Sequence, residues 1–264
     1  MLTVLKLGGE LLEDQAALAN AASAIVRIAA DGPVAVVHGG GRAIDAELRI
    51  RGIEPRFVDG LRITDEATLD VVVCVLAGRT NTALVAALGA AGARAVGLTG
   101  ADARIGLSRI ATPLQSVAGA SEDLGLVGQP EGGDTQLLTE LTGRGYIPVI
   151  ASIGVTDDGD LLNVNADTLA AQLATSLPAD RFIIAGGTAG VLDAEGVTIP
   201  ELGRMAMNTM TSSGTAHSGM VAKLAACRRA LEAGVREIAI VNGRGEADYR
   251  TAPGTRITRE MATK

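Results

Sequence analysis

Two glycine-rich segments follow short apolar runs and carry charged residues beside their glycines. Residues 36–42 read VVHGGGR, and residues 3–12 read TVLKLGGELL. Glycine costs about 0.5–1 kcal/mol more than alanine inside regular structure, so three in a row after an apparent strand require an explanation. Glycines between a strand and a helix let the backbone approach a ligand, and the N–H groups of helix N-termini favour anions. Since the carboxyl ends of parallel strands can face one crevice, the two turns together predict an anion site.

The named phosphate-binding and hydrolase motifs are absent. No GxxxxGK[ST] P-loop occurs, and GxGxxG fails because Ile44 stands where the third glycine is required. An HGGG segment can form the oxyanion hole of a lipase-like hydrolase, but the GxSxG elbow is missing. His217 is the only late histidine, and it follows a Thr/Ser loop. A purely structural tight turn remains as the simpler alternative, and we interpret His38 as a structural histidine at a strand end.

Two further constellations favour a ligand site. NVNAD at 163–167 precedes the helical pattern TLAAQLATSL, which places two amides and a carboxylate at a helix start. Such residues are commonly only helix caps. SGMVAK at 218–223 places Lys223 one turn into another helix, where a lone lysine is usually a solvated surface residue. Four such constellations in one chain are harder to explain as unrelated structural turns.

The composition excludes several classes of protein. The 264 residues are 47% hydrophobic but only 2% aromatic, which indicates an aliphatic core. The net charge is −7 and no Lys/Arg run occurs, so we expect no nucleic-acid partner. Cys74 and Cys227 lie far apart in no metal-ligand spacing, which indicates reduced thiols in a cytoplasmic protein. The N-terminus has no long apolar segment or cleavage signature, so we expect no membrane partner.

The elements that must position these residues alternate between short apolar runs and longer amphipathic stretches. This alternation predicts βαβ units, and so an α/β fold with a mainly parallel sheet covered on both faces. Helical spacing relates Leu18, Ile25 and Ile28, and again Leu84 and Leu88. The predicted strands are Thr3–Leu7, Val34–His38, Arg94–Leu98, Ile147–Ala151, Arg181–Ala185 and Glu237–Val241.

Three segments interrupt this pattern. TDDGD at 156–160 lies between apolar runs and predicts a hairpin. Residues 99–130 lack clear periodicity and predict short strands and loops lying over one lobe. Residues 205–220 are predicted to be loop-like. A lobe boundary is expected near Pro178, where a helix ends and a new strand begins.

The ordered set of motifs resembles the amino acid kinase family, and most closely its branch that phosphorylates N-acetyl-L-glutamate. The matching pieces span almost the whole chain in the family's order: KLGGELL, VVHGGG, GLRIT, AVGLTG, LGLVGQ, GYIPVIASIGV, NVNAD and SGMVAK. The resemblance implies a three-layer α/β/α sandwich, the amino acid kinase fold. It also implies an amino-terminal lobe, 1–178, for the amino acid and for dimerisation, and a carboxy-terminal lobe, 179–264, for ATP.

The implied reaction transfers the γ-phosphoryl group of ATP to the side-chain carboxylate of the acetylated amino acid, in the cytoplasmic synthesis of arginine. That carboxylate is ionised at pH 7, so no general base is needed. The difficulty is the approach of two anions, and catalysis becomes mainly positioning and charge stabilisation. Mg²⁺ is expected on the ATP phosphates with few direct protein ligands.

Roles in phosphoryl transfer follow by motif match. Lys6 resembles the lysine on the transferring group and Lys223 the lysine on the leaving-group side. Asp167 resembles the carboxylate that holds both lysines. The resemblance assigns phosphate or nucleotide contacts to Gly8, Gly9, Gly219 and Met220.

Roles in acceptor binding follow in the same way. Arg62 resembles the arginine that pairs with the substrate α-carboxylate through its planar fork. Asn163, Gly40 and Gly41 would complete the acetylglutamate site, and Gly40 would also donate its N–H to the phosphoryl group. One departure is Gly186, which stands in AGGTAGVLD where the family usually has an aspartate.

Alternatives remain open at this level. A sister kinase acting on another N-acylated or carrier-bound amino acid would share most of these motifs, and the acyl group is not encoded in them. A non-catalytic amino-acid sensor of the same fold is a second alternative. In the family, arginine-inhibited hexamers use a helix before the first strand, which here begins by Thr3. The expectation is therefore an arginine-insensitive homodimer that buries the helix around Val71–Leu84.

Overall fold

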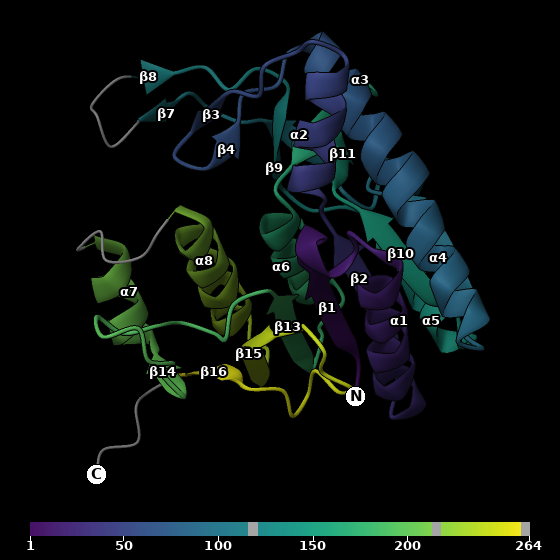
Figure 1. Ribbon diagram of the computed structural model, residues 1–264, viewed down its shortest axis with the longest axis vertical. Helices are drawn as coiled ribbons and strands as arrows, with labels where there is room; N and C mark the ends of the chain where they lie inside the picture. The colour runs from purple at the N-terminus through teal and green to yellow at the C-terminus, as the bar shows by residue number, and fades with distance from the viewer. Residues whose placement is uncertain (116–120, 213–217, 260–264) are drawn as a thin grey trace.

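An eight-stranded sheet forms the centre of the protein (Figure 1). The computed structural model describes residues 1–115, 121–212 and 218–259. All neighbouring strands of the sheet run parallel except β15 and β16, which confirms the expected mainly parallel α/β fold. In spatial order the strands are β14 (Glu201–Gly203), β16 (Gly254–Thr258), β15 (Glu237–Asn242), β13 (Arg181–Gly186), β1 (Thr3–Leu7), β2 (Val34–His38), β10 (Ile147–Ala151) and β5 (Ala95–Thr99).

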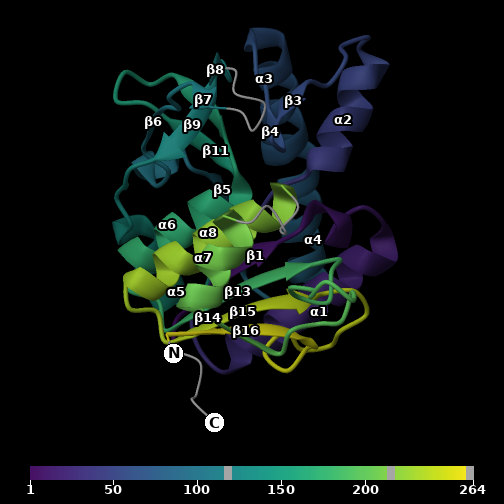
Figure 2. The ribbon, with the colours of Figure 1, turned by 90° about the vertical axis from the view of Figure 1, so that its left-hand side faces the viewer.

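Helices cover both faces of this sheet, so the protein is the predicted three-layer sandwich. One face packs on α1 (Gln15–Ala30) and α4 (Asn81–Ala90). The other face packs on α5 (Gln136–Gly143), α6 (Ala166–Ser176) and α8 (Ser218–Glu232). Figure 2 views the molecule from the side of α6, α7 and α8. The cores are almost wholly aliphatic, as the composition predicts.

The central strand β1 divides its side chains between the two cores. Leu5 and Leu7 belong to the cluster with α1, whereas Val4 belongs to the cluster with α6 and α8. Because side chains alternate along a strand, Lys6 leaves β1 on the face of Val4. Strand alternation therefore directs this lysine toward α6 and α8.

The boundary between the chain's two parts runs through the middle of the sheet. Strands β1, β2, β10 and β5 come from residues before Pro178, and β13, β14, β15 and β16 come from residues after it. The two sets meet where β1 pairs in parallel with β13, with Lys6 opposite Ile184. Here successive connections leave in opposite directions, which is where α/β sheets open a crevice.

A smaller layer of strands lies beside the sheet. A second sheet has the order β11 (Ile153–Val155), β12 (Leu161–Val164), β9 (Val127–Pro130) and β6 (Ser108–Ile110). β11 and β12 are antiparallel around TDDGD, so the predicted hairpin is confirmed. Residues 99–130 contain short strands and loops in their described part, including β7 (Leu114–Gln115) and β8 (Ser121–Glu122). The hairpin of β3 (Phe57–Val58) and β4 (Leu61–Arg62) completes this layer.

One long apolar helical segment passes a membrane-span test by length and composition. It joins α3 (Glu66–Val73), the π-helical turn Cys74–Thr80 and α4, with a mean hydropathy of 1.8 over its most apolar window. A core helix passes the same test, and 44% of that window is buried. Val71, Val72 and Leu76 are at most 1% exposed in the protein's own core beside α2 (Gly41–Ile50). The expectation of no membrane partner stays a prediction.

Most predicted strands match the observed ones to within a residue. β5 ends one residue later than predicted, at Thr99, and β13 and β15 each extend by one residue. The loop predicted over 205–220 is wrong in its described part. Residues Arg204–Ser212 form α7, and Ser218 begins α8. The hydroxyls of this helix can be satisfied without a turn, since Thr211 Oγ1 donates to the Met207 carbonyl four residues earlier.

Candidate active site

Three charged side chains from three elements meet at the carboxyl end of β1. The Lys6 Nζ lies 3.0 Å from Asp167 Oδ1, and the Lys223 Nζ donates to Asp167 Oδ2 at 3.2 Å. All three are largely buried, with side-chain exposures of 8% for Lys6, 6% for Asp167 and 18% for Lys223. The chain has only three lysines, the third being Lys264, so two of the three lie in this cluster.

Local structure fixes the position of each charged group. Asp167 is the second residue of α6, whose start is capped by Asn165 through bonds from the Asp167 and Thr168 N–H groups. Helix α8 packs against α6 and carries Lys223 toward the same point. Burial alone would raise the pKa of Asp167, but the charges of the two lysines outweigh it and hold the pKa below its ordinary value of 3.8. The cluster therefore carries a net positive charge at neutral pH.

The first cavity beside this cluster has a volume of about 280 Å³ and a mostly polar lining. Lys6, Asp167, Gly9 of the first glycine-rich turn and Gly39, Gly40 and Gly41 of the second border it. A Cβ built on Gly9 would lie 2.9 Å from the Gly40 Cα, so the two turns are in backbone contact. A Cβ on Gly41 would meet no atom within 4 Å. The structure thus joins Gly9, Gly40 and Gly41 at one cavity, as the sequence predicts.

The predicted phosphoryl contact of Gly8 requires a correction. The Gly8 N–H donates to the Ala185 carbonyl at 2.7 Å, which continues the β1–β13 pairing beyond the strand end. This N–H is therefore not free to bind a phosphoryl oxygen. The Gly9 N–H, by contrast, stands at the start of the 3₁₀ helix Gly9–Leu11, where an N–H group lacks an intrahelical partner.

Arg62 borders the same cavity with an unsatisfied nitrogen. Its Nη2 lies 2.6 Å from Asp45 Oδ1, and its guanidinium stacks 4.6 Å from the Phe57 ring centroid. The buried Nη1 has no hydrogen-bond partner. One N–H group of Arg62 is therefore left unsatisfied beside the cavity, which is costly for a buried guanidinium.

Asn163 lies beside Arg62 through a polar chain. The Asn163 Nδ2 donates to Thr64 Oγ1 at 2.9 Å, and the Thr64 hydroxyl donates to the Arg62 carbonyl at 3.1 Å. Asn163 borders the cavity together with Arg62. The structure brings these two predicted residues together and adds Thr64, which the sequence analysis did not select.

A second cavity, of about 490 Å³, lies on the other side of the charged cluster. Its lining is mainly apolar and includes Gly219, Met220 and Lys223 at the start of α8, with Val191 and Leu192 opposite. Gly219 and Met220 belong to the first turn of a 15-residue helix, where free N–H groups favour anions. The predicted nucleotide contacts of α8 thus share a cavity with Lys223.

His38 is a core residue at the end of β2, directly before the glycines that border the first cavity. It is fully buried, its Nε2 lies 3.0 Å from the Asn81 Nδ2, and its Nδ1 lies 3.1 Å from the Gly39 carbonyl. Burial lowers the pKa of His38 from 6.5 to about 4, so the ring is neutral at pH 7. The structural interpretation of His38 is confirmed, and His217 lies outside the described residues.

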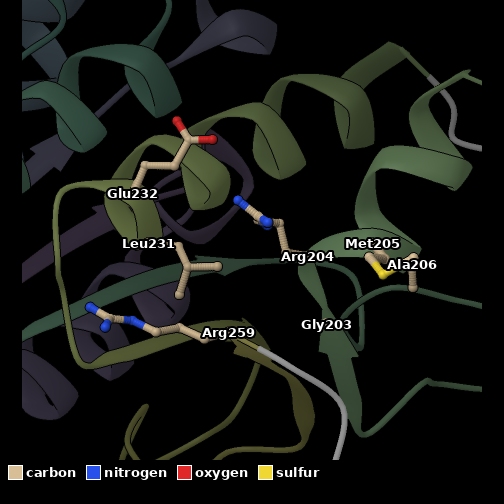
Figure 3. Close-up of a pocket in the computed structure, with 7 residues that line it drawn as sticks. All are labelled: Gly203, Arg204, Met205, Ala206, Leu231, Glu232 and Arg259. Carbon is tan, nitrogen blue, oxygen red and sulfur yellow. The ribbon is translucent and has the colours of Figure 1, made fainter.

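A third cavity, of about 560 Å³, is separate from both (Figure 3). It lies between the start of α7, the end of α8 and the residue after β16, where Arg204, Glu232 and Arg259 border it. It shares no lining residue with the other two cavities. None of the predicted site residues belongs to it.

Comparison with known proteins agrees with this arrangement. The family model described as the amino acid kinase family matches residues 1–242. The chain belongs to the amino acid kinase family. Cys74 and Cys227 are free cysteines, as the sequence predicts, and neither lines either of the two cavities beside the charged cluster.

The relatives of this amino acid kinase share one name. The chain is 39% identical to the acetylglutamate kinase of Koribacter versatilis, over 91% of this chain and 90% of that protein. It is 40% identical to the acetylglutamate kinase of Sphingopyxis alaskensis, over 91% of this chain and 82% of that protein. The solved N-acetylglutamate synthase of Neisseria gonorrhoeae matches with a TM-score of 0.83 and 24% identity, over 99% of this chain and 60% of that one. That likeness shows the fold alone.

Two carboxylates at the site escaped the sequence analysis. Glu10 lies in the first glycine-rich turn, and its Oε1 accepts the Gly187 N–H at 2.6 Å. Its acidic character directly after KLGG was the available signal. Asp45, on α2, pairs with Arg62 at the end of β4. No local pattern relates those two positions, because a tertiary contact alone brings them together.

Proposed function

We propose that this chain is an acetylglutamate kinase, which transfers the γ-phosphoryl group of ATP to the side-chain carboxylate of N-acetyl-L-glutamate in arginine biosynthesis. The observation that carries the proposal is the buried Lys6–Asp167–Lys223 cluster between two cavities of different character. The name shared by relatives about 40% identical over most of the chain gives the substrate.

The proposed chemistry requires charge and position rather than proton abstraction. A glutamate side chain is ionised at pH 7, so it attacks without a general base. The neutral, fully buried His38 fits this requirement, since it is not a base in contact with the acceptor. Lys6 and Lys223 would stabilise the charge that spreads over the phosphoryl oxygens in the transition state, and Asp167 would hold both ammonium groups in place.

The acceptor is proposed to bind in the first cavity. The unpartnered Nη1 of Arg62 would pair with the α-carboxylate of the acetylated amino acid. Gly40 and Gly41 would approach the acceptor through their backbone, and Asn163 would contribute its amide. Gly9 and Gly40 would direct N–H groups at the transferring phosphoryl group.

The nucleotide is proposed to bind in the second cavity, with Gly219, Met220 and Lys223 near its phosphates. Apart from Glu10, this lining comes from residues after Pro178, while the first cavity is lined by residues before it. This supports an amino-acid lobe over 1–178 and an ATP lobe over 179–264. Mg²⁺ bound with ATP would neutralise part of the phosphate charge, and no group of three or more possible metal-binding side chains occurs in the described ranges.

The proposed assembly is a cytoplasmic homodimer formed through the amino-terminal lobe. The larger side chains of the Val71–Leu84 segment are mostly buried within the protomer, whereas Val73 and Ala77 are partly exposed and Cys74 and Ala83 are exposed. β5 lies at the edge of the sheet beside this helix. Light scattering tests the proposal, because a monomeric mass would contradict it.

A coupled assay of ADP release tests the activity. The purified chain is given ATP, Mg²⁺ and a panel of acceptors that includes N-acetyl-, N-succinyl- and unblocked L-glutamate. Turnover with N-acetyl-L-glutamate above the other acceptors supports the proposal. Preference for another acylated amino acid would favour the sister kinase, and absence of turnover with retained acceptor binding would favour a sensor.

A further inference from the structure

Among the described residues, Glu10 alone lines both cavities of the proposed site. It belongs to the first glycine-rich turn, directly after Gly8 and Gly9, and its carboxylate lies where the acceptor side meets the nucleotide side. Neither the motif analysis nor the proposed chemistry uses this residue. A carboxylate beside the proposed position of the ATP phosphates would repel them, so its presence there requires a physical explanation.

Three glycines make the space that holds this carboxylate. A Cβ on Gly8 would lie 2.5 Å from Glu10 Oε2, and a Cβ on Gly186 would lie 3.1 Å from Glu10 Oε1. The Gly187 N–H donates to Oε1 at 2.6 Å. A side chain at Gly186 or Gly187 would therefore compete with the Glu10 side chain for this space.

The other carboxylates of the two cavities are Asp167 and Asp193. Both oxygens of Asp167 contact lysines. Asp193 Oδ1 accepts the Glu195 and Val197 N–H groups, and Glu10 Oε1 accepts the Gly187 N–H. Neither Glu10 nor Asp193 forms an ion pair with a described side chain, but of these two only Glu10 borders both cavities and lies in the field of Lys6 and Lys223.

The carboxylate of Glu10 is ionised at neutral pH. Burial raises its pKa, but hydrogen bonds from its own N–H and from Gly187, with the charges of Lys6 and Lys223, lower it below its ordinary value. An ionised carboxylate at this place would repel ATP unless a cation lay between them. Mg²⁺ is commonly held by one or two protein carboxylates together with substrate phosphates.

We propose that Glu10 is the protein's oxygen ligand for the divalent cation that enters with the nucleoside triphosphate. This inference rests on the proposed function, since it requires a nucleotide in the second cavity. It assigns Glu10 to the cation, and it leaves Lys6 and Lys223 to the phosphates. It also gives Gly8 a role different from the predicted one, because Gly8 makes room for the carboxylate.

Calorimetric titration with a non-hydrolysable ATP analogue, once in Mg²⁺ and once in EDTA, tests this assignment. The substitution at Glu10 should change the affinity for the analogue differently in the two conditions. Glu10→Gln keeps the side-chain shape and can still accept the Gly187 N–H. In saturating Mg²⁺ the variant is expected to bind the analogue about tenfold or more weakly, the scale found for lost support of a metal. In EDTA the same variant is expected to bind the analogue equally or more tightly, because a repelling charge has been removed.

Glu13→Gln is the matched control, since Glu13 is paired with Arg42 at an exposed position and borders neither of the two proposed binding cavities. It should leave both affinities unchanged. Equal affinities of Glu10→Gln and wild type in Mg²⁺ would overturn the assignment, and so would equal weakening in Mg²⁺ and EDTA, which indicates a structural role. Failure of the wild type to bind the analogue in either condition would overturn the proposed function and this inference with it.

Discussion

Gly9 and Gly40 touch through their backbones, with only 2.9 Å between the position of a Gly9 Cβ and the Gly40 Cα. The contact follows from the sheet. β1 and β2 are parallel neighbours, and Leu7 lies opposite His38 at their ends. The two turns that follow therefore leave the sheet side by side, and only residues without side chains let both chains border one cavity. This is the physical reason for the paired glycine-rich segments.

Gly9→Ala is expected to destabilise the protein and to abolish turnover. The new Cβ would meet backbone rather than a flexible side chain, so one of the two turns must shift. Overpacking of this kind costs about 1–3 kcal/mol. Chemical denaturation measures the stability and the ADP-release assay measures turnover. Wild-type values in both would show that the two turns are not in contact.

Gly41→Ala, unlike Gly9→Ala, is expected to keep the stability of the protein and to weaken acceptor binding. A Cβ there meets nothing within 4 Å, and Gly41 begins α2, where alanine favours the helix. Stability should be unchanged or slightly higher. The added methyl group points into open space at the acceptor cavity, so the KM for acetylglutamate should rise about tenfold, the scale of one methylene in a binding pocket. An unchanged KM would place the acceptor away from Gly41.

These glycines also show which features of the site could be predicted from the sequence and which could not. Strand alternation and the strand-to-helix turns are local, so the positions of Lys6, the two turns and the capped start of α6 could all be predicted. The partners of those groups depend on distant contacts. Asp45 beside Arg62 and the Ala185 carbonyl that occupies the Gly8 N–H could not be predicted, since neither pairing leaves a pattern in the chain.

Lys6→Ala and Lys223→Ala are each expected to reduce kcat by roughly 10²–10³-fold, because each removes a charge that matters most in the transition state. Each single variant keeps one lysine on Asp167, so the fold should persist. The loss of stability should be larger for Lys6, whose side chain is 8% exposed against 18% for Lys223. Lys264→Ala is the matched control, and wild-type kcat in either site variant would contradict the assignment.

Arg62→Lys is expected to weaken acceptor binding selectively. Lysine keeps the charge but loses the planar fork, whose Nη2 is held by Asp45 while the buried Nη1 has no partner. Loss of one charged hydrogen bond contributes about 1.5–3 kcal/mol, so the KM for acetylglutamate should rise about 10- to 100-fold. The KM for ATP should hold. Arg42→Lys, at an exposed site, is the control, and equal weakening for both substrates would place Arg62 elsewhere.

His38→Gln is expected to flatten the pH dependence of stability between about pH 4 and pH 6.5. Burial lowers the pKa of His38 from 6.5 to about 4, so in this window the unfolded chain binds a proton that the folded protein does not. Stability must therefore fall as the pH falls through the window. At about 1.4 kcal/mol for each pKa unit, His38 accounts for a loss of about 3 kcal/mol of folding stability across this window.

Glutamine cannot titrate in this window, yet its side-chain oxygen can still accept a hydrogen bond from the Asn81 amide. Urea unfolding of both proteins at several pH values measures the difference, in which all other titrating groups cancel. Parallel curves for His38→Gln and wild type would show that His38 has the same pKa in the folded and unfolded protein, which would contradict its burial as a neutral ring.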